Sequence, residues 1–314
     1  MIFTLILFLV GFAILIKGAS ALVDGAVSVA NIFRLSPMVV GLVIVGIGTS
    51  IPEFAVAFIG NLLGQADIVL GTVAGSNTFN LLFILGLSAA VSPLAFKSIW
   101  VGRDLLWNIG AVAVSAVLVF GAGSTGLDRG GGVILLLLFF LWLIFVLRIV
   151  NEAESEVPLA RRVVAAPIAL LFIAAGLAGV ILGGRWVVEG AVQIAYTLGA
   201  SEALVALTML SIGTSLPELA VSVAAAWRRE AGIAVGNIIG SNIFDFLMIL
   251  GASAMVRPVF ASPALIPDVA ATALAAGLLF GAMFVGERYI LKRWQGILFI
   301  ALYLLYFAYL VIRG

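Results

Sequence analysis

The stretch GTSIPEFAVAFIGNLLGQADIVLGTVAGSNTFN at residues 48–80 decides the fold, because it returns as GTSLPELAVSVAAAWRREAGIAVGNIIGSNIFD at residues 213–245. A shift of 165 residues, without a gap, gives 30 identities over residues 24–94. Polar, glycine and proline positions match as well as apolar ones, and biased composition alone does not explain that agreement. The sequence therefore contains an internal repeat.

The composition places both copies in a membrane. Of 314 residues, 64% are hydrophobic and 10% are charged, against roughly a quarter charged in ordinary soluble domains. This apolar content is enough for roughly ten bilayer spans of ~20 residues each. We therefore predict an all-α polytopic membrane protein. The net charge of +1 gives no reason to expect nucleic acid as a partner.

Apolar runs separated by glycine, proline and charged clusters predict ten transmembrane helices. We expect them at residues 1–23, 36–62, 67–91, 99–121, 131–150, 163–184, 201–227, 231–256, 265–286 and 294–312. The domains are then a first five-helix repeat at 1–150, a cytoplasmic linker at 151–162, and a second five-helix repeat at 163–314. The linker is polar and too short to hold a folded regulatory domain.

The spacing of the repeat predicts its orientation. Because five spans separate equivalent positions, the two copies must cross the membrane in opposite directions, as in many secondary transporters. The Lys and Arg residues of the connections between predicted spans are counted for each side of the membrane. Twelve lie on one side, with Lys17 in the first connection, and four lie on the other, with Arg185 among them. The positive-inside bias then predicts a multi-pass protein of the cell membrane with both termini extracellular. Asp24 and Glu189 are expected near the mouths of the bundle.

Three carboxylates, Glu53, Glu218 and Asp245, fall deep inside predicted spans. Acidic residues at membrane depth are costly and mark functional sites by default. Pro52 and Pro217 directly precede the two glutamates, and a proline inside a helix breaks it and frees a carbonyl group. A freed carbonyl at membrane depth is tolerable where it lines a cavity or binds something. We therefore expect broken helices at an ion or substrate site.

Hydroxyl and amide groups surround these carboxylates in both copies. Thr49 lies four residues before Glu53, as Thr214 does before Glu218, and each pair shares one face if the helix continues. The candidate metal ligands are the oxygen-bearing residues of the two motifs: Glu53, Glu218, Asp245, Asn80, Thr49, Thr214, Ser50, Ser215, Ser76 and Ser241, with backbone oxygens of Gly46 and Ser211.

The chain contains no histidine and no cysteine. An imidazole base, a thiolate metal site and Ser-His-Asp catalysis are therefore excluded, and we expect neither an enzyme nor a cofactor. A site made only of oxygen suits hard cations such as sodium or calcium. One calcium ion neutralises only two of the three carboxylates. Asp245, whose equivalent is the neutral Asn80, is expected to be the one left protonated or uncompensated.

Neighbouring positions have more ordinary explanations. GTVAG at 71–75 and GNIIG at 236–240 place small residues four apart, which predicts close helix packing. Asn77 and Asn242 could bind an ion, or could instead satisfy freed backbone groups.

The paired GTS-[IL]-PE and GSN-x-F-[ND] motifs, within 36–91 and 201–256, resemble the alpha-repeats of the cation/calcium antiporter superfamily. The closest resemblance is to prokaryotic sodium/calcium exchangers. It implies electrogenic exchange of about three Na+ for one Ca2+ by alternating access, with the first and sixth helices sliding over a more rigid core. Beyond these ions and the lipid bilayer, no obligatory protein partner is implied. The residues it places at the centre of the site are Glu53, Asn80, Glu218 and Asp245, and the threonines and serines above match further ligand positions.

Other functions remain open on the sequence alone. A proton/calcium exchanger or a potassium-dependent sodium/calcium exchanger of the same superfamily is the main alternative. A cation channel with a carboxylate ring would also use broken helices, although an inverted repeat favours a carrier. An intramembrane enzyme would need paired aspartates or a Ser/Lys dyad inside the spans.

Overall fold

The structure, a computed structural model, describes residues 2–121, 126–149, 164–197, 212–260 and 262–313. Its helical elements, with η marking π- or 3-10-helical segments, are α1 (Ile2–Phe33), α2 (Pro37–Val40), η1 (Gly41–Val45), α3 (Gly46–Thr49), α4 (Ile51–Leu62), α5 (Ala66–Thr78), η2 (Phe79–Ile84), α6 (Leu85–Val91), α7 (Ser98–Trp100), η3 (Val101–Leu105), α8 (Leu106–Phe120), α9 (Arg129–Ile149), α10 (Ala166–Thr197), α12 (Leu216–Trp227), α13 (Ala231–Ile243), η4 (Phe244–Ile249), α14 (Leu250–Val256), η5 (Pro263–Leu265), α15 (Ile266–Ala282) and α16 (Arg293–Arg313). Two short strands, β1 (Leu94–Ala95) and β2 (Ile290–Leu291), pair antiparallel.

Eight helices of the described residues are long and apolar enough to cross a membrane, and nine if the bent pair Pro37–Thr49 and Ile51–Leu62 is one span. The chain is therefore a helical, multi-pass membrane protein. Of the predicted seventh span, the structure describes α12 and the turn before it. The rest lies outside the described residues, as does the predicted linker at 151–162, so the count of ten stays a prediction.

The predicted ends of the first and sixth spans are wrong. Helix α1 continues to Phe33 and α10 to Thr197, because no proline or strong turn signal interrupts either apolar run. Lys17 and Arg185 lie within these helices, although the count of charges by side assigned both to connections. Both residues must therefore be removed from the count of loop charges on which the predicted orientation depends.

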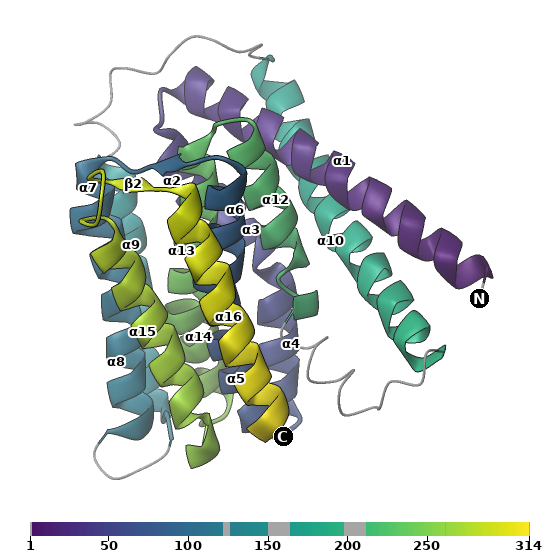
Figure 1. Ribbon diagram of the computed structural model, residues 1–314. Coiled ribbons are helices and arrows are strands. Elements are labelled where there is room, and N and C mark those ends of the chain that lie inside the picture. Colours follow the sequence, from purple (N-terminus) through teal and green to yellow (C-terminus); the bar gives the residue numbers. More distant parts are fainter. Residues whose placement is uncertain (1, 122–125, 150–163, 198–211, 261, 314) are drawn as a thin grey trace.

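Helices α1 and α10 form a pair that lies side by side and obliquely beside the remaining helices (Figure 1). Small residues let their backbones approach closely. A Cβ atom added at Gly18 would lie 2.8 Å from the backbone carbon of Gly179, and one at Gly179 would lie 3.0 Å from the Cα of Gly18. The two helices therefore pack as one unit.

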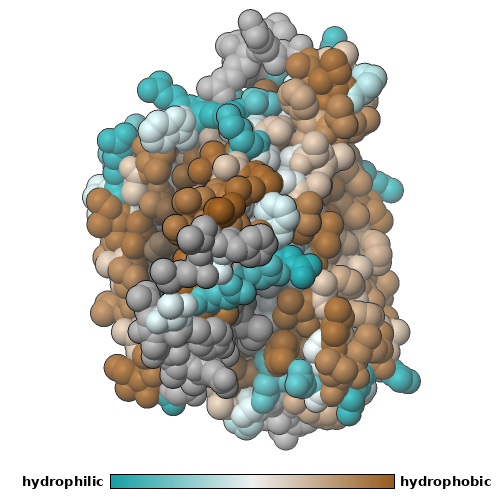
Figure 2. Space-filling model, turned by 90° about the vertical axis from the view of Figure 1, so that its right-hand side faces the viewer, coloured by the Kyte–Doolittle hydropathy of each residue, from teal (hydrophilic) through white to brown (hydrophobic). Residues whose placement is uncertain are grey.

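The centre of the bundle consists of two helices that follow the glutamate motifs. In the span α5–η2–α6, 78% of the most apolar window is buried, and in α13–η4–α14 the share is 94%, whereas it is 39% or less in the other six long helices. In the view of Figure 2, hydrophobic residues cover much of the outer face. Hydrophilic ones gather towards its two ends and in a narrow band between them. This pattern fits a surface that faces lipid.

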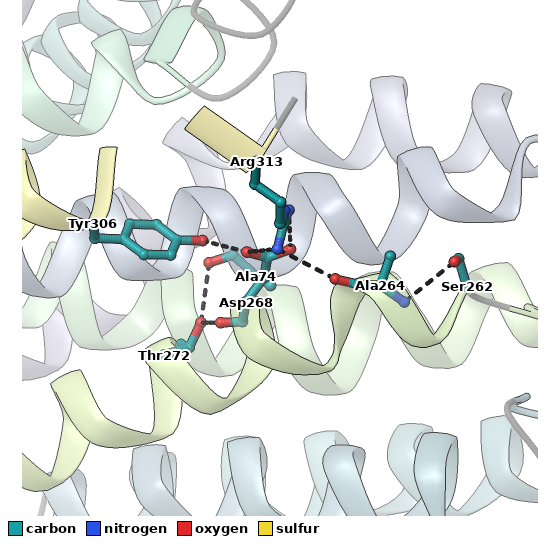
Figure 3. A network of polar contacts seen from close by, with 7 residues as sticks. All are labelled: Ala74, Ser262, Ala264, Asp268, Thr272, Tyr306 and Arg313. Atoms are coloured by element: carbon teal, nitrogen blue, oxygen red, sulfur yellow. Dashed lines mark hydrogen bonds and ion pairs between the residues drawn. The ribbon is translucent and has the colours of Figure 1, made fainter. Parts of the chain in front are cut away.

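A polar network ties α15 to α16 and α5 (Figure 3). Asp268 on α15 forms an ion pair with Arg313 at 2.9 Å and accepts a hydrogen bond from the Tyr306 hydroxyl at 2.9 Å. Thr272 Oγ1, one turn further along α15, lies 3.1 Å from the Ala74 carbonyl oxygen of α5. The buried carboxylate of Asp268 thus has a cationic partner on its own chain.

Candidate functional site

Two breaks in the helices carry the glutamates to the centre of the bundle. Ser50, with φ −82° and ψ 7°, separates α3 from α4, and the two helices are bent by 45°. Ser215 has nearly the same angles, φ −89° and ψ 7°, directly before α12. Pro52 lies in the first turn of α4, where its missing N–H group costs nothing. The predicted broken helix is therefore present, with the proline starting the second segment.

The break overturns one expectation about the threonines. Thr49 ends α3 while Glu53 belongs to the first turn of α4, so the two do not share the face of a continuous helix. The Thr49 hydroxyl instead donates to Asn237 Oδ1 of α13 at 3.0 Å. In the other copy, Thr214 lies in the turn that precedes α12.

The two glutamates are held by serines of the opposite copy. Ser50 Oγ donates to Glu218 Oε1 at 3.1 Å, and Ser215 Oγ donates to Glu53 Oε1 at 3.0 Å. Both carboxylates are buried, with exposures of 1% for Glu53 and 0% for Glu218. Each serine–glutamate bond joins residues more than 160 positions apart, so the site exists only where the two copies meet.

Asn80 and Asp245 lie in equivalent π-helical segments, η2 and η4. Short π segments inside α-helices are rare and frequent at functional sites. Asp245 Oδ2 accepts from Asn77 Nδ2 at 2.8 Å, and Asn80 Nδ2 donates to Asn242 Oδ1 at 3.1 Å. Asn77 Nδ2 also donates to the Val73 carbonyl at 2.7 Å. It therefore satisfies a backbone group, as one of the two sequence explanations predicted, and it also orients Asp245. Ion binding by Asn77 stays a prediction.

A second cluster of oxygen atoms lies beside Glu218. Ser241 Oγ is 3.1 Å from the Gly46 carbonyl oxygen and 3.4 Å from Glu218 Oε1. Thr49 Oγ1 is 3.3 Å from the same carbonyl. The backbone oxygen expected at Gly46 is thus among the side chains of the site. Its equivalent, Ser211, lies outside the described residues.

Each central carboxylate keeps one oxygen atom without a hydrogen-bond partner. These atoms are Glu53 Oε2, Glu218 Oε2 and Asp245 Oδ1. Three buried neutral oxygens of the same motifs also lack a hydrogen-bond partner. They are Ser76 Oγ, Asn77 Oδ1 and Asn80 Oδ1. A buried carboxylate without compensation costs far more than a hydrogen-bonded one, so these atoms mark a place for a cation or a proton.

The other buried carboxylates of the described chain have their own arginines. Asp268 is paired with Arg313, and Asp104, which is fully buried, is paired with Arg103 at 2.8 Å. Within the described residues, none of the three central carboxylates forms an ion pair. In this part of the chain, no basic side chain balances their charge, which leaves the site open to a bound cation or a proton.

The site is lined by oxygen donors. Its donors are carboxylate, hydroxyl, amide and carbonyl oxygens, which suit sodium and calcium. Among the described residues, no three acidic side chains group closely enough to hold a metal ion by themselves. A cation bound here would need neutral oxygens to complete its coordination, and the serines and asparagines of both copies carry such oxygens.

The sequence analysis missed two features of this site. The π segments were not foreseen, because their i→i+5 bonding leaves no mark in hydrophobic periodicity. Asn237 was considered only as part of a packing motif. The available signal was that position 237 carries an amide where position 72 carries a hydroxyl.

The packing prediction for the two glycine motifs is confirmed in one copy. A Cβ atom added at Gly236 would lie 2.6 Å from the Met38 carbonyl oxygen, and one at Gly240 would overlap the Leu42 carbonyl oxygen. Gly71 has nothing within 4 Å of an added Cβ, so close packing at that glycine was wrongly predicted.

The chain is similar to known proteins over most of its length. A family model described as sodium/calcium exchanger protein matches residues 3–148 and 168–312. Inner membrane protein YrbG of Escherichia coli (strain K12) is 37% identical over 80% of this chain and 79% of its own length. Sodium/calcium exchanger MaX1 of Methanosarcina acetivorans is 27% identical over 98% and 97%, respectively. A structure of the sodium-calcium exchanger NCX_Mj soaked with Na+ and Ca2+ superposes with a TM-score of 0.85 at 32% identity, covering 98% of both chains.

Proposed function

Because this chain belongs to the sodium/calcium exchanger family, a family of transporters, we propose that it is a sodium/calcium antiporter that exchanges Na+ for Ca2+ by alternating access. The observation that carries the proposal is the set of unpartnered oxygens on Glu53, Glu218 and Asp245. These buried carboxylates have no cationic partner among the residues that the structure describes, so ions passing through the protein would neutralise them in turn.

Competition for the same oxygens provides the coupling. Glu53 and Glu218 are linked to each other's motifs through Ser215 and Ser50, so a calcium ion and sodium ions that use both carboxylates exclude one another. With neither ion bound, the buried carboxylates make the switch between the two sides costly. We propose a stoichiometry of about three Na+ per Ca2+, which makes transport electrogenic, because three sodium ions balance three carboxylates.

The proposed ligands are those expected from the sequence: the four central side chains, the threonines and serines around them, and the backbone oxygens of Gly46 and Ser211. Ten spans in two inverted repeats are proposed for the whole chain. The match of the family model to residues 3–148 and again to 168–312 supports two related halves. We propose the cell membrane as the location, with both termini extracellular, and neither a cofactor nor an obligatory protein partner.

Calcium uptake into vesicles that contain the purified protein tests the proposal. Vesicles loaded with sodium and diluted into sodium-free medium should accumulate calcium and develop a membrane potential. Uptake should not require potassium, and should persist when a protonophore collapses the proton gradient. Failure of sodium-loaded vesicles to take up calcium, or equal uptake driven by protons alone, would contradict sodium/calcium exchange.

A further inference from the structure

Asn237 is a fully buried amide on α13, next to one half of the candidate site. A Cβ atom added at Gly46 would lie 2.9 Å from the Asn237 carbonyl oxygen. The backbones of α3 and α13 therefore approach closely at this level, because residue 46 is a glycine. This approach brings the Asn237 side chain to the hydroxyl of Thr49.

The hydrogen bonds around Asn237 determine which way its amide points. Asn237 Nδ2 lies 2.8 Å from Ser222 Oγ and 3.3 Å from the Glu218 carbonyl oxygen. Ser222 Oγ is itself 3.5 Å from the Ala234 carbonyl. The Ser222 hydroxyl can therefore donate to Ala234 and accept from Asn237. Both neighbours of Nδ2 are acceptors, so the amide oxygen must face Thr49.

In this orientation, Asn237 offers an acceptor to the single hydroxyl hydrogen of Thr49. Thr49 Oγ1 lies 3.0 Å from Asn237 Oδ1 and 3.3 Å from the Gly46 carbonyl oxygen. A hydroxyl group has one hydrogen to donate and two lone pairs, and the shorter contact is to the amide. With its hydrogen directed to Asn237, Thr49 keeps its lone pairs for a cation, and the Gly46 carbonyl keeps accepting capacity as well.

The first copy lacks this arrangement. The residue equivalent to Asn237 is Thr72, which is buried and whose Oγ1 has no hydrogen-bond partner. The residue equivalent to Ser222 is Ala57, which has no polar side chain. The amide and the serine that orients it are thus confined to the copy that contains Glu218.

We propose that Asn237 is a positioning residue that directs the Thr49 hydroxyl hydrogen away from the ion and thereby sets the sodium affinity of the site beside Glu218. The proposal deepens the proposed exchange of sodium for calcium and rests on it. The oxygen cluster of Thr49, Gly46 and Ser241 contains one carboxylate, that of Glu218. One carboxylate matches the charge of one monovalent ion, whereas calcium requires two. The orientation of Thr49 therefore affects sodium more than calcium.

The test is the ion dependence of an N237A variant in vesicles. Without the amide, the Thr49 hydrogen turns to Gly46 or towards the ion. We expect the half-saturating sodium concentration to rise about tenfold, the equivalent of one hydrogen bond, and that of calcium to change less than about threefold. An equal change for both ions would overturn the proposal. If N237A cannot be isolated folded, N237S, which likewise lacks the amide, is measured under the same criteria.

Two further variants separate positioning from a structural role. T72A removes the equivalent buried hydroxyl of the first copy and should leave both ion dependences unchanged. In a T49V background, which has no hydroxyl to orient, N237A should cause no further loss of sodium affinity. A sodium effect of N237A that persists at full size in T49V would contradict action through Thr49.

The outcomes also distinguish this inference from the function on which it rests. If the unaltered protein does not couple calcium uptake to sodium, the proposed function fails. If the unaltered protein exchanges normally and N237A has the same sodium dependence, only the role of Asn237 fails.

Discussion

The two copies of the motif differ less at their glutamates than at the π-helical segments that follow. Ser50 donates to Glu218 at 3.1 Å and Ser215 donates to Glu53 at 3.0 Å, so each copy supplies the hydroxyl that holds the other's carboxylate. In the π segments the equivalent residues are Asn80 and Asp245, one neutral and one acidic.

In the proposed exchange of sodium for calcium, the difference between these regions would separate two tasks. A pair of equivalent carboxylates at the contact of the two copies can serve a divalent ion from either side of the membrane. A single extra carboxylate changes the total charge without a matching partner, and suits the balance between different numbers of monovalent and divalent ions. The outer helices repeat the contrast, because Asp24 of α1 pairs with Arg228 beyond α12, whereas Glu189 of α10 pairs with Arg185 of its own helix.

The largest expected effect is the loss of either glutamate. E53Q and E218Q should each reduce sodium-driven calcium uptake by at least about 100-fold, because a buried charge that loses its partner costs about 3–5 kcal/mol. Uptake into sodium-loaded vesicles measures the effect. Calcium uptake should decrease to a similar extent in both variants, and full uptake in either one would contradict the equivalence of the two glutamates.

Asp245, whose equivalent in the other copy is the neutral Asn80, should behave differently from the two glutamates. D245N should keep calcium binding within about tenfold of the unaltered protein, because a calcium ion is balanced by two carboxylates, while the dependence of transport on sodium becomes less steep. Calcium binding and sodium titration of transport measure the two effects. The N80D/D245N double variant is the matched control, since it restores the charge in the other π segment. An unchanged sodium dependence in D245N would argue against the charge-balance role.

The serines provide a smaller effect and a direct test of symmetry. S50A and S215A each remove a hydroxyl that donates to a glutamate of the opposite copy. A hydrogen bond to a charged group contributes about 1.5–3 kcal/mol, so each variant should lose roughly tenfold or more in apparent calcium affinity. The two losses, read from calcium titrations of uptake, should agree within about threefold. A much larger effect in one variant would show that the two copies hold their glutamates unequally.

The smallest effect is expected at the outer helices. R228L removes the ion pair between α1 and α12 and places at 228 the residue type found at the equivalent Leu63. A partly exposed pair contributes about 0.2–1 kcal/mol, so the melting temperature should fall slightly, and less so at high salt. R185L, which affects a pair within α10, should have a smaller effect still. An R228L effect that is independent of salt would rule out the ion pair as its cause.

Much of this site was predictable because its determinants are local. Pro52 and Pro217 predict the helix breaks, and three acidic residues in apolar runs predict the site. The ends of α1 and α10 were not predictable in the same way, because charged residues such as Asp24 and Arg185, which directly follow the predicted ends, can lie within a helix when their side chains are exposed on the surface. Ser211 and the linker lie outside the described residues and remain predictions.

The sequence by itself determined the membrane class, the repeat, the interrupted helices and the all-oxygen chemistry, since each follows from residue type and spacing along the chain. Only the tertiary structure decided that Ser50 holds Glu218, that Ser215 holds Glu53, and that Asn237 holds Thr49. These bonds join residues 162 to 188 positions apart. Their partners are chosen by which helices meet across the two copies and where π segments turn the side chains, and neither property is encoded in a local pattern.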